Sequence, residues 1–270
     1  MNNRIEKNIY TAIATLALVF ALSSCEKEIE VDLRSVPPRI VIEGMIQEDV
    51  VAMVKLSTTR DFGDDNNYSF LSGATVKVSD NEGNEEILTQ DQSGWYLGRN
   101  LKGKAGCVYN LSVLYDDTEY TATSQMPPKV AIDSLTMYKI KMMDYALPML
   151  HLTDPKGDVN QFYRCLLYIN GTQRQDTREL VSSAEFADGS PLHLILPVFS
   201  ENDDVIPIQK GDEILVEMQC IDKDAYIFYE SLSNIENSLT NPVTNIKGGA
   251  LGVFFAFSCD QMKIVVEWKD

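Results

Sequence analysis

The side chains best suited to acid–base chemistry are few in this chain. Its two histidines, His151 and His193, each stand beside leucines in strand-like segments. Histidine is the commonest general base in enzymes, yet these apolar neighbours favour a structural histidine. Neither the Gly-x-Ser-x-Gly turn of a serine hydrolase nor the His-Glu-x-x-His helix of a zinc protease occurs. The sequence therefore predicts that the protein is not an enzyme, although a pair of carboxylates from distant strands, as in glycosidases, stays open.

One segment matches the spacing of a phosphate-binding loop. Residues 98–104 follow the pattern Gly-x-x-x-x-Gly-Lys. The next residue is Ala105, whereas the magnesium ion bound by such a loop needs Ser or Thr at this position. The loop also needs a helix N-terminus directly behind it, and a β-type segment follows here. We therefore predict that this segment is not a nucleotide site.

Two acidic loops gather the oxygen ligands that calcium prefers. The first contains Asp61, Asp64 and Asp65, and the second contains Asp154 and Asp158. Neither loop has the residue order of an EF-hand with its closing glutamate. Loops rich in Asp and Asn also form turns without any metal, so both interpretations stay open. No cofactor is predicted beyond this calcium candidate.

A sulfur-rich group follows near the middle of the chain. It consists of Met137, Met142, Met143, Met149 and His151. Thioether and imidazole groups are ligands for copper, so a copper site is one interpretation. Methionine that fills an irregular hydrophobic core is the commoner explanation, and it is the one that we adopt.

Ser134 is a candidate glycosylation site. It stands in the tripeptide Asp133-Ser134-Leu135, which resembles the short acceptor used for O-glycosylation in Bacteroidota. Three residues carry little specificity. The tripeptide nevertheless lies close to a predicted domain boundary, which is a suitable place for such an acceptor.

The first 24 residues indicate export. Arg4 and Lys7 form a short positive head, and residues 9–22 carry no charge. This run is shorter than the roughly 20 residues that a membrane-spanning helix needs, so we interpret residues 1–24 as a cleaved signal peptide. The Leu-Ser-Ser before Cys25 resembles a bacterial lipobox, in which the cysteine thiol receives diacylglycerol. An ordinary secretory signal that ends just before Cys25 is the alternative.

Residues 25–36 are predicted to form an acidic tether behind this cysteine. Residues 26–30, Glu-Lys-Glu-Ile-Glu, resemble the export tag that carries Bacteroidota lipoproteins to the outer face of the outer membrane. Solvation of a tether explains the same residues without a tag. We therefore expect a protein anchored by lipid in the outer membrane and facing the cell exterior, with the periplasmic face left open.

The charge of the chain argues against some partners. Its 270 residues carry a net charge of −17 at pH 7. The phosphates of nucleic acid need clustered Lys and Arg, and anionic lipid headgroups attract the same residues. We therefore predict that the protein binds no nucleic acid. The length suits one large domain or two smaller ones.

Four cysteines remain if Cys25 is lipidated: Cys107, Cys165, Cys220 and Cys259. Each stands in an apolar or strand-like stretch, and the sequence lacks the close Cys spacing of a zinc site. Export reaches an oxidising compartment, so one or two disulfides stay open, and the sequence does not choose among the pairings. Buried free thiols are the interpretation that we favour.

Residues 37–128 are predicted to form one β-sandwich. Ala74, Val76 and Val78 alternate with polar neighbours, which is the period-two pattern of a half-buried strand. A turn of Asp, Asn and Gly follows at residues 80–84. About seven short strands of this kind are typical of an immunoglobulin-like unit.

The order of motifs in this sandwich resembles the prealbumin-like carboxypeptidase-regulatory or Cna-B domain. Those domains have a Gly-Ala strand, an Asp-x-x-Gly turn, an Asp-x-x-Gly-x-Tyr strand and a Gly-x-x-Tyr-x-Leu strand. The chain keeps all four in that order, beginning at Gly73, Asp80, Asp91 and Gly106. The resemblance implies a prealbumin-like fold for residues 37–128.

A second β-rich domain is predicted over residues 129–270, because Pro127 and Pro128 break the β pattern. Between residues 222 and 237, apolar side chains recur every three or four positions, which predicts an amphipathic helix with Asp222 at its N-cap. Its apolar stripe consists of Ala225, Phe228, Tyr229, Leu232 and Ile235. A central strand should follow, and Gly248-Gly249 before it indicates a bulge or a close backbone approach.

Beyond its signal peptide, the chain resembles a Bacteroidota lipoprotein family named domain of unknown function 4249. The matching marks begin with the lipobox and continue in one order: VIEG at 41–44, Gly-Ala at 73–74, IDSL at 132–135, TDPKG at 153–157, DAYIFY at 224–229 and NIKGG at 245–249. The resemblance implies a gene beside those of TonB-dependent outer-membrane receptors. It carries over no functional residues.

Together these features predict a non-enzymatic accessory to a TonB-dependent receptor. The accessory would capture a nutrient or cap the barrel of that receptor. A binding protein needs a rigid scaffold and exposed loops. The expected contact surfaces are the 61–70 loop and the 222–241 helix with its exit. In the loop, three aromatic side chains can stack on a ligand or pack in the core: Phe62, Tyr68 and Phe70. The alternative functions are a structural or adhesive surface protein and a surface hydrolase with dispersed carboxylates.

Overall fold

The structure is a computed structural model that describes residues 37–60, 70–139, 146–157, 161–174, 180–199, 206–238 and 240–267. Contacts divide the chain into two units, Met1–Val36 and Pro37–Asp270. All described residues belong to the second unit. This unit is mostly β with several sheets, as the sequence predicts.

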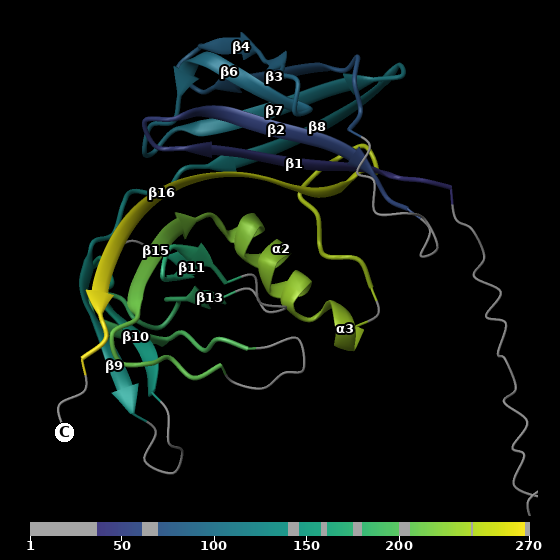
Figure 1. Cartoon of the computed structure of the whole chain (residues 1–270). Helices are drawn as coiled ribbons and strands as arrows, with labels where there is room; N and C mark the ends of the chain where they lie inside the picture. The colour runs from purple at the N-terminus through teal and green to yellow at the C-terminus, as the bar shows by residue number, and fades with distance from the viewer. Residues whose placement is uncertain are drawn as a thin grey trace, which may run out of the picture. The chain divides into compact units, whose positions relative to one another are not determined.

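Two layers of strands form a sandwich in the first half of this unit (Figure 1). The strands are β1 (Ile40–Gln47), β2 (Val51–Thr58), β3 (Thr75–Asp80), β4 (Glu85–Ile87), β5 (Thr89–Gln90), β6 (Trp95–Lys102), β7 (Val108–Tyr115) and β8 (Thr118–Gln125). One layer has the order β1-β2-β6-β5 and the other β4-β3-β7-β8. Ile42 and Val54 from the first layer share a buried core with Val76 and Leu111 from the second.

Local sequence explains why these strands and turns form. In β3, Val76 and Val78 are fully buried while the residues between and around them are more exposed, as the period-two pattern predicts. The turn that follows is held by Asp80, whose carboxylate accepts hydrogen bonds from the backbone N–H groups of Glu82 and Asn84, both at 2.9 Å. The predicted strand and turn are both present.

The second half contributes a three-stranded sheet, β14-β10-β9, and more strands of a larger sheet. The strands are β9 (Ile132–Lys139), β10 (Ala146–Thr153), β11 (Phe162–Ile169), β12 (Thr172–Gln173), β13 (Leu180–Ser183), β14 (Pro191–Ile195), β15 (Glu213–Ile221) and β16 (Leu251–Val265). A second hydrophobic core joins the two sheets. It includes Leu150 of β10, Tyr163 of β11 and Val216 of β15.

The 15-residue strand β16 connects the two halves. Its first part pairs with β1 in parallel, from Leu251 to Phe257, and its second part pairs with β15 antiparallel, from Ser258 to Val265. Figure 1 shows it as the long yellow arrow that runs from β1 to β15. The predicted central strand is therefore present. Strands from both sides of Pro128 pair with β16 in one sheet. The domain boundary predicted near Pro128 stays a prediction.

The predicted helix is present as α2 (Lys223–Ser233), followed by the short α3 (Ile235–Ser238). Ala225 and Tyr229 are buried, and the ring of Tyr229 contacts that of Phe255 on β16 at 5.6 Å between centroids. The apolar stripe was expected to include Ile235, and this part is wrong. Asn234 ends α2 with a non-helical backbone, so Ile235 leaves the stripe and is 39% exposed.

The four described cysteines are free thiols, the interpretation that the sequence favours. Cys107, Cys165 and Cys220 are buried, and Cys259 is half-buried. Burial raises the pKa of the Cys165 thiol to about 12, so this group stays protonated and unreactive at neutral pH.

Candidate functional site

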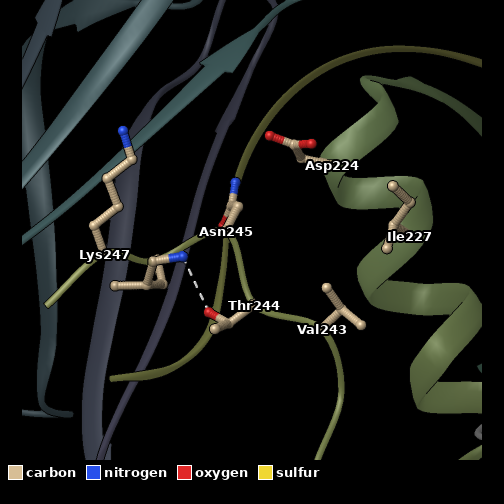
Figure 2. Close-up of a pocket in the computed structure, with 7 residues that line it drawn as sticks. Asp224, Ile227, Val243, Thr244, Asn245 and Lys247 are labelled. Atoms are coloured by element: carbon tan, nitrogen blue, oxygen red, sulfur yellow. Dashed lines mark hydrogen bonds between the residues drawn. The ribbon is translucent and has the colours of Figure 1, made fainter. Parts of the chain in front are cut away.

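A small cavity lies where the chain leaves α2 and returns towards β16 (Figure 2). Its volume is about 270 Å³. Residues from α2 and from the segment 243–247, which we call the strap, line it: Asp224, Ile227, Val243, Thr244, Asn245, Ile246 and Lys247. The cavity lies on the surface for which the sequence predicts a contact role, the helix and its exit.

The α2 wall of the cavity is positioned from its first turn. Asp222 caps the helix by accepting a hydrogen bond from the N–H of Ala225 at 2.9 Å. Ala225 is buried against β16, so Asp224 and Ile227, three positions apart, turn towards the strap. Figure 2 shows the Asp224 carboxylate and the Ile227 side chain on this helix.

The strap is tied to β16 by side chains rather than by strand pairing. The Asn245 amide donates to the carbonyl of Phe254 at 2.7 Å and accepts from its N–H at 3.0 Å. The Thr244 hydroxyl donates to the carbonyl of Gly252 at 2.7 Å and accepts from the N–H of Ile246 at 3.0 Å, the dashed line in Figure 2. These bonds hold the cavity wall in one shape.

The last residue of the strap, Lys247, pairs with Thr121 on strand β8 of the sandwich. The N–H of Lys247 donates to the carbonyl of Thr121 at 2.7 Å, and the N–H of Thr121 donates back at 3.2 Å. The next residue, Gly248, has a φ of +98°, and a Cβ there would lie 2.7 Å from the carbonyl oxygen of Glu119. The close backbone approach predicted for the glycine pair is therefore found at Gly248.

The cavity combines two opposite charges with an apolar wall. The Asp224 carboxylate can bind a cationic group and the Lys247 ammonium an anionic one, and Figure 2 shows them on either side of Asn245. Ile227 and Val243, the latter 55% exposed, supply apolar surface. The Thr244 hydroxyl is already bonded to a backbone carbonyl. This arrangement suits the binding of a dipolar group rather than nucleophilic chemistry.

A second cavity, of about 640 Å³, lies beside the segment that matches a phosphate loop. There the carboxylate of Glu86 accepts hydrogen bonds from the backbone N–H groups of Arg99 at 2.8 Å and Leu101 at 2.9 Å, and also from Asn100. Burial alone would raise the pKa of Glu86, but these N–H groups hold it below its usual value. The donors that could cradle a phosphate are thus bonded to a carboxylate.

Few of the predicted ligand residues can be placed. Phe70 is 38% exposed, and the Lys55 ammonium lies 5.5 Å from the centre of its ring, so a cation already covers this aromatic face. Seven of them lie outside the described residues: Cys25, Asp61, Phe62, Asp64, Asp65, Tyr68 and Asp158. Their roles stay predictions.

Asp154 and Ser134 are both placed. Asp154 is 2% exposed and accepts a hydrogen bond from the hydroxyl of Tyr163 at 3.0 Å. Across the described parts of the chain, no group of three or more His, Cys, Asp or Glu side chains is arranged to hold a metal ion. Calcium at this loop stays a prediction. Ser134 is half-buried on β9, opposite His151 on β10.

The sulfur-rich group is only partly described. Met137 packs against the second core, in keeping with the adopted core interpretation. Met142 and Met143 lie outside the described residues. Sequence reasoning did not find the strap, although the motif at 245–249 marks its position.

Three further findings concern membrane-spanning helices and the comparison with known proteins. No helix in the described ranges has the length and apolar character to cross a bilayer. Among curated proteins, no match to this chain is found. A family model does match, over residues 26–263, a stretch that includes both cavities and every described strand except the last residues of β16. The chain therefore belongs to the family described as Domain of unknown function (DUF4249).

Proposed function

We propose that this chain is a lipid-anchored outer-membrane protein of Bacteroidota that faces the cell exterior and assists a TonB-dependent receptor in nutrient capture or uptake. The lipobox-like residues before Cys25 and the acidic residues behind it support the anchor and the location. The family resemblance supports the receptor. The motif order in residues 37–128 supports a prealbumin-like sandwich. Catalysis has no part in this proposal.

The preformed cavity between α2 and the strap carries the proposal of a binding role. Its wall is held by two hydrogen bonds between Asn245 and the backbone of Phe254, so little ordering is needed when a ligand binds. Its volume of about 270 Å³ is near the lower limit of ligand pockets. The ligand that we propose is a dipolar group the size of an amino acid or a peptide end, with its ammonium at Asp224 and its carboxylate at Lys247.

Reversing either charge is expected to reduce uptake by the partner receptor. A hydrogen bond to a charged group contributes about 1.5–3 kcal/mol, so Asp224→Lys or Lys247→Glu should lower uptake about tenfold or more. The measurement is receptor-dependent uptake of short peptides in the native host, with each variant replacing the wild-type protein. Lys139→Glu, on an exposed lysine of β9, is the control and should leave uptake unchanged.

The partner itself is tested by co-purification. The protein carries a C-terminal tag in its native host, and the outer membrane is solubilised gently. A TonB-dependent receptor recovered in near-equal amount is expected. Recovery of the chain alone or as a homopolymer would contradict the accessory role and favour an adhesive one. Unchanged growth and uptake after deletion of the gene would contradict it as well.

A further inference from the structure

The three-stranded sheet holds the two histidines of the chain side by side. β10 and β14 pair antiparallel, and His151 and His193 are partners in that register. Leu150 and Leu194, their neighbours along the strands, point into the second core. Because side chains alternate along a strand, both imidazoles stand on the outer face, where His193 is exposed and His151 is half-buried.

The two rings meet through their Nδ1 atoms. These atoms are 2.7 Å apart, and the ring planes make an angle of 70°. At this distance one nitrogen carries a proton and the other accepts it. A metal ion about 2.0 Å from both nitrogens would replace that proton. It would lie to one side of the line that joins the nitrogens, and both rings would turn towards it.

A third strand positions one of the imidazoles. The Thr136 hydroxyl on β9 lies 2.8 Å from Nε2 of His151. If this oxygen accepts the Nε2–H, then Nδ1 of His151 is left with its lone pair free. Metal-binding histidines commonly donate their second ring N–H to such a partner, which holds the tautomer and the ring orientation. The sheet thus supplies two ligands and one orienting group.

The spacing of the two nitrogens, which is that of a hydrogen bond, is nearer to one ligand geometry than to another. Two neighbouring ligands about 2.0 Å from a square-planar or tetragonal ion lie about 2.8 Å apart, whereas a tetrahedral ion separates them by about 3.3 Å. The observed 2.7 Å is close to the first value. Cu²⁺ prefers tetragonal nitrogen sites and has the highest affinity among the divalent first-row ions.

The charge around the pair favours a cation. The side chains on β9, β10 and β14 that carry a full charge at neutral pH are Asp133 and Lys139. The Asp133 carboxylate lies on the same face as His151, because it accepts a hydrogen bond at 2.8 Å from Thr153, two residues further along β10. Lys139 pairs with Ala146 at the far end of the sheet.

We propose that His151 and His193 form a surface site for a transition-metal ion of tetragonal geometry, with Cu²⁺ as the preferred ion. Thr136 is a positioning residue that acts through His151. The remaining coordination positions are open to water or to an oxygen or nitrogen donor from outside the chain. This site is independent of the cavity beside α2 and of the receptor proposed above.

Titration of the full chain with Cu²⁺ tests the proposal. Isothermal calorimetry should show one tight site, and the electron paramagnetic resonance spectrum should show coupling to two imidazole nitrogens. His151→Gln and His193→Gln should each weaken binding about 100-fold or more, since loss of an outer-shell partner alone weakens metal sites about 10- to 100-fold. Thr136→Val should weaken it less, and Ser134→Ala, opposite His151, should not change it.

A measurement on the wild-type chain needs no variant. The two histidines are the only ones present, so their ring signals can be assigned in NMR spectra of a histidine-labelled sample. Substoichiometric Cu²⁺ should broaden both signals together. Thiols reduce Cu²⁺ but do not reduce Ni²⁺, so Ni²⁺ is the second probe. It should broaden the same two histidine signals. Broadening of one signal alone, or Cu²⁺ binding that survives both histidine substitutions, would overturn the proposal.

Discussion

A Gly252→Ala variant is expected to lose about 4 kcal/mol or more of its unfolding free energy, a loss at the extreme of single substitutions. Gly252 has a φ of +99°, and a Cβ there would lie 2.0 Å from the carbonyl oxygen of Ile42. Ile42 is its direct partner in the parallel pairing of β1 with β16. The added methyl group therefore adds backbone strain and also forces the two strands apart.

Gly249→Ala is the matched control for this variant. Gly249 has a φ of +94°, but its added Cβ would meet no atom within 4 Å. Only the strain of a left-handed alanine remains, about 1–2 kcal/mol. Urea unfolding followed by circular dichroism measures both variants. Equal losses at Gly252 and Gly249 would show that the contact with Ile42 does not limit the pairing.

Failure of Gly252→Ala to fold would agree with the same reasoning, because β16 is the strand that both halves share. The side chains of Phe254 and Ala256 are buried in the first core, whereas the later part of β16 pairs with β15. Separation of β1 from β16 therefore exposes the first core and removes the link between the halves.

An Asp222→Ala variant is expected to lose about 3 kcal/mol of its unfolding free energy. The carboxylate accepts hydrogen bonds from the N–H groups of Ala225 at 2.9 Å and Gln125 at 3.1 Å, and from the hydroxyl of Ser124. Ser124 is 2% exposed and also accepts from the N–H of Ala256 at 2.8 Å. Alanine removes the helix cap, worth about 1 kcal/mol. It also leaves the hydroxyl of the buried Ser124 without this partner, at about 1–3 kcal/mol, whereas Gln125 is exposed to water.

Asp224→Ala is the control for this loss. Asp224 is an exposed acid in the first turn of the same helix, and its removal should cost less than about 1 kcal/mol through the helix dipole. Denaturant unfolding at constant pH compares the two variants. A loss at Asp222 no larger than that at Asp224 would mean that the bonds to Ser124 and Gln125 contribute little.

The loss at Asp222 should also depend on pH. Burial raises the pKa of this carboxyl, although the bonds from Ser124, Ala225 and Gln125 act in the opposite direction. A raised pKa means that the folded state holds the proton more tightly than the unfolded chain does. The resulting stability is complete below the ordinary value of 3.8 and is lost as the pH rises through the folded value. The cost of Asp222→Ala should therefore be larger at about pH 3 than at about pH 7, and a cost that grows with pH would contradict this assignment.

Local patterns predicted much of the fold. The alternation of Val76 and Val78 depends only on which face of one strand is buried, and the cap at Asp222 depends on an N–H three residues away. The same approach failed at Ile235, because the apolar spacing continues past Asn234 while the helix does not. Of the candidate site, the sequence indicated the helix and its exit but not the strap.

The sequence by itself determined the β character of the chain, the position of its capped helix and its family, because these depend on neighbouring residues and on motif order. Only the tertiary structure decided that β16 pairs with β1, that Asn245 holds the strap against Phe254, and that His151 meets His193. These contacts depend on the register between strands or on side chains that reach another segment. Residues far apart in the chain set that register together, so no single stretch of sequence contains it.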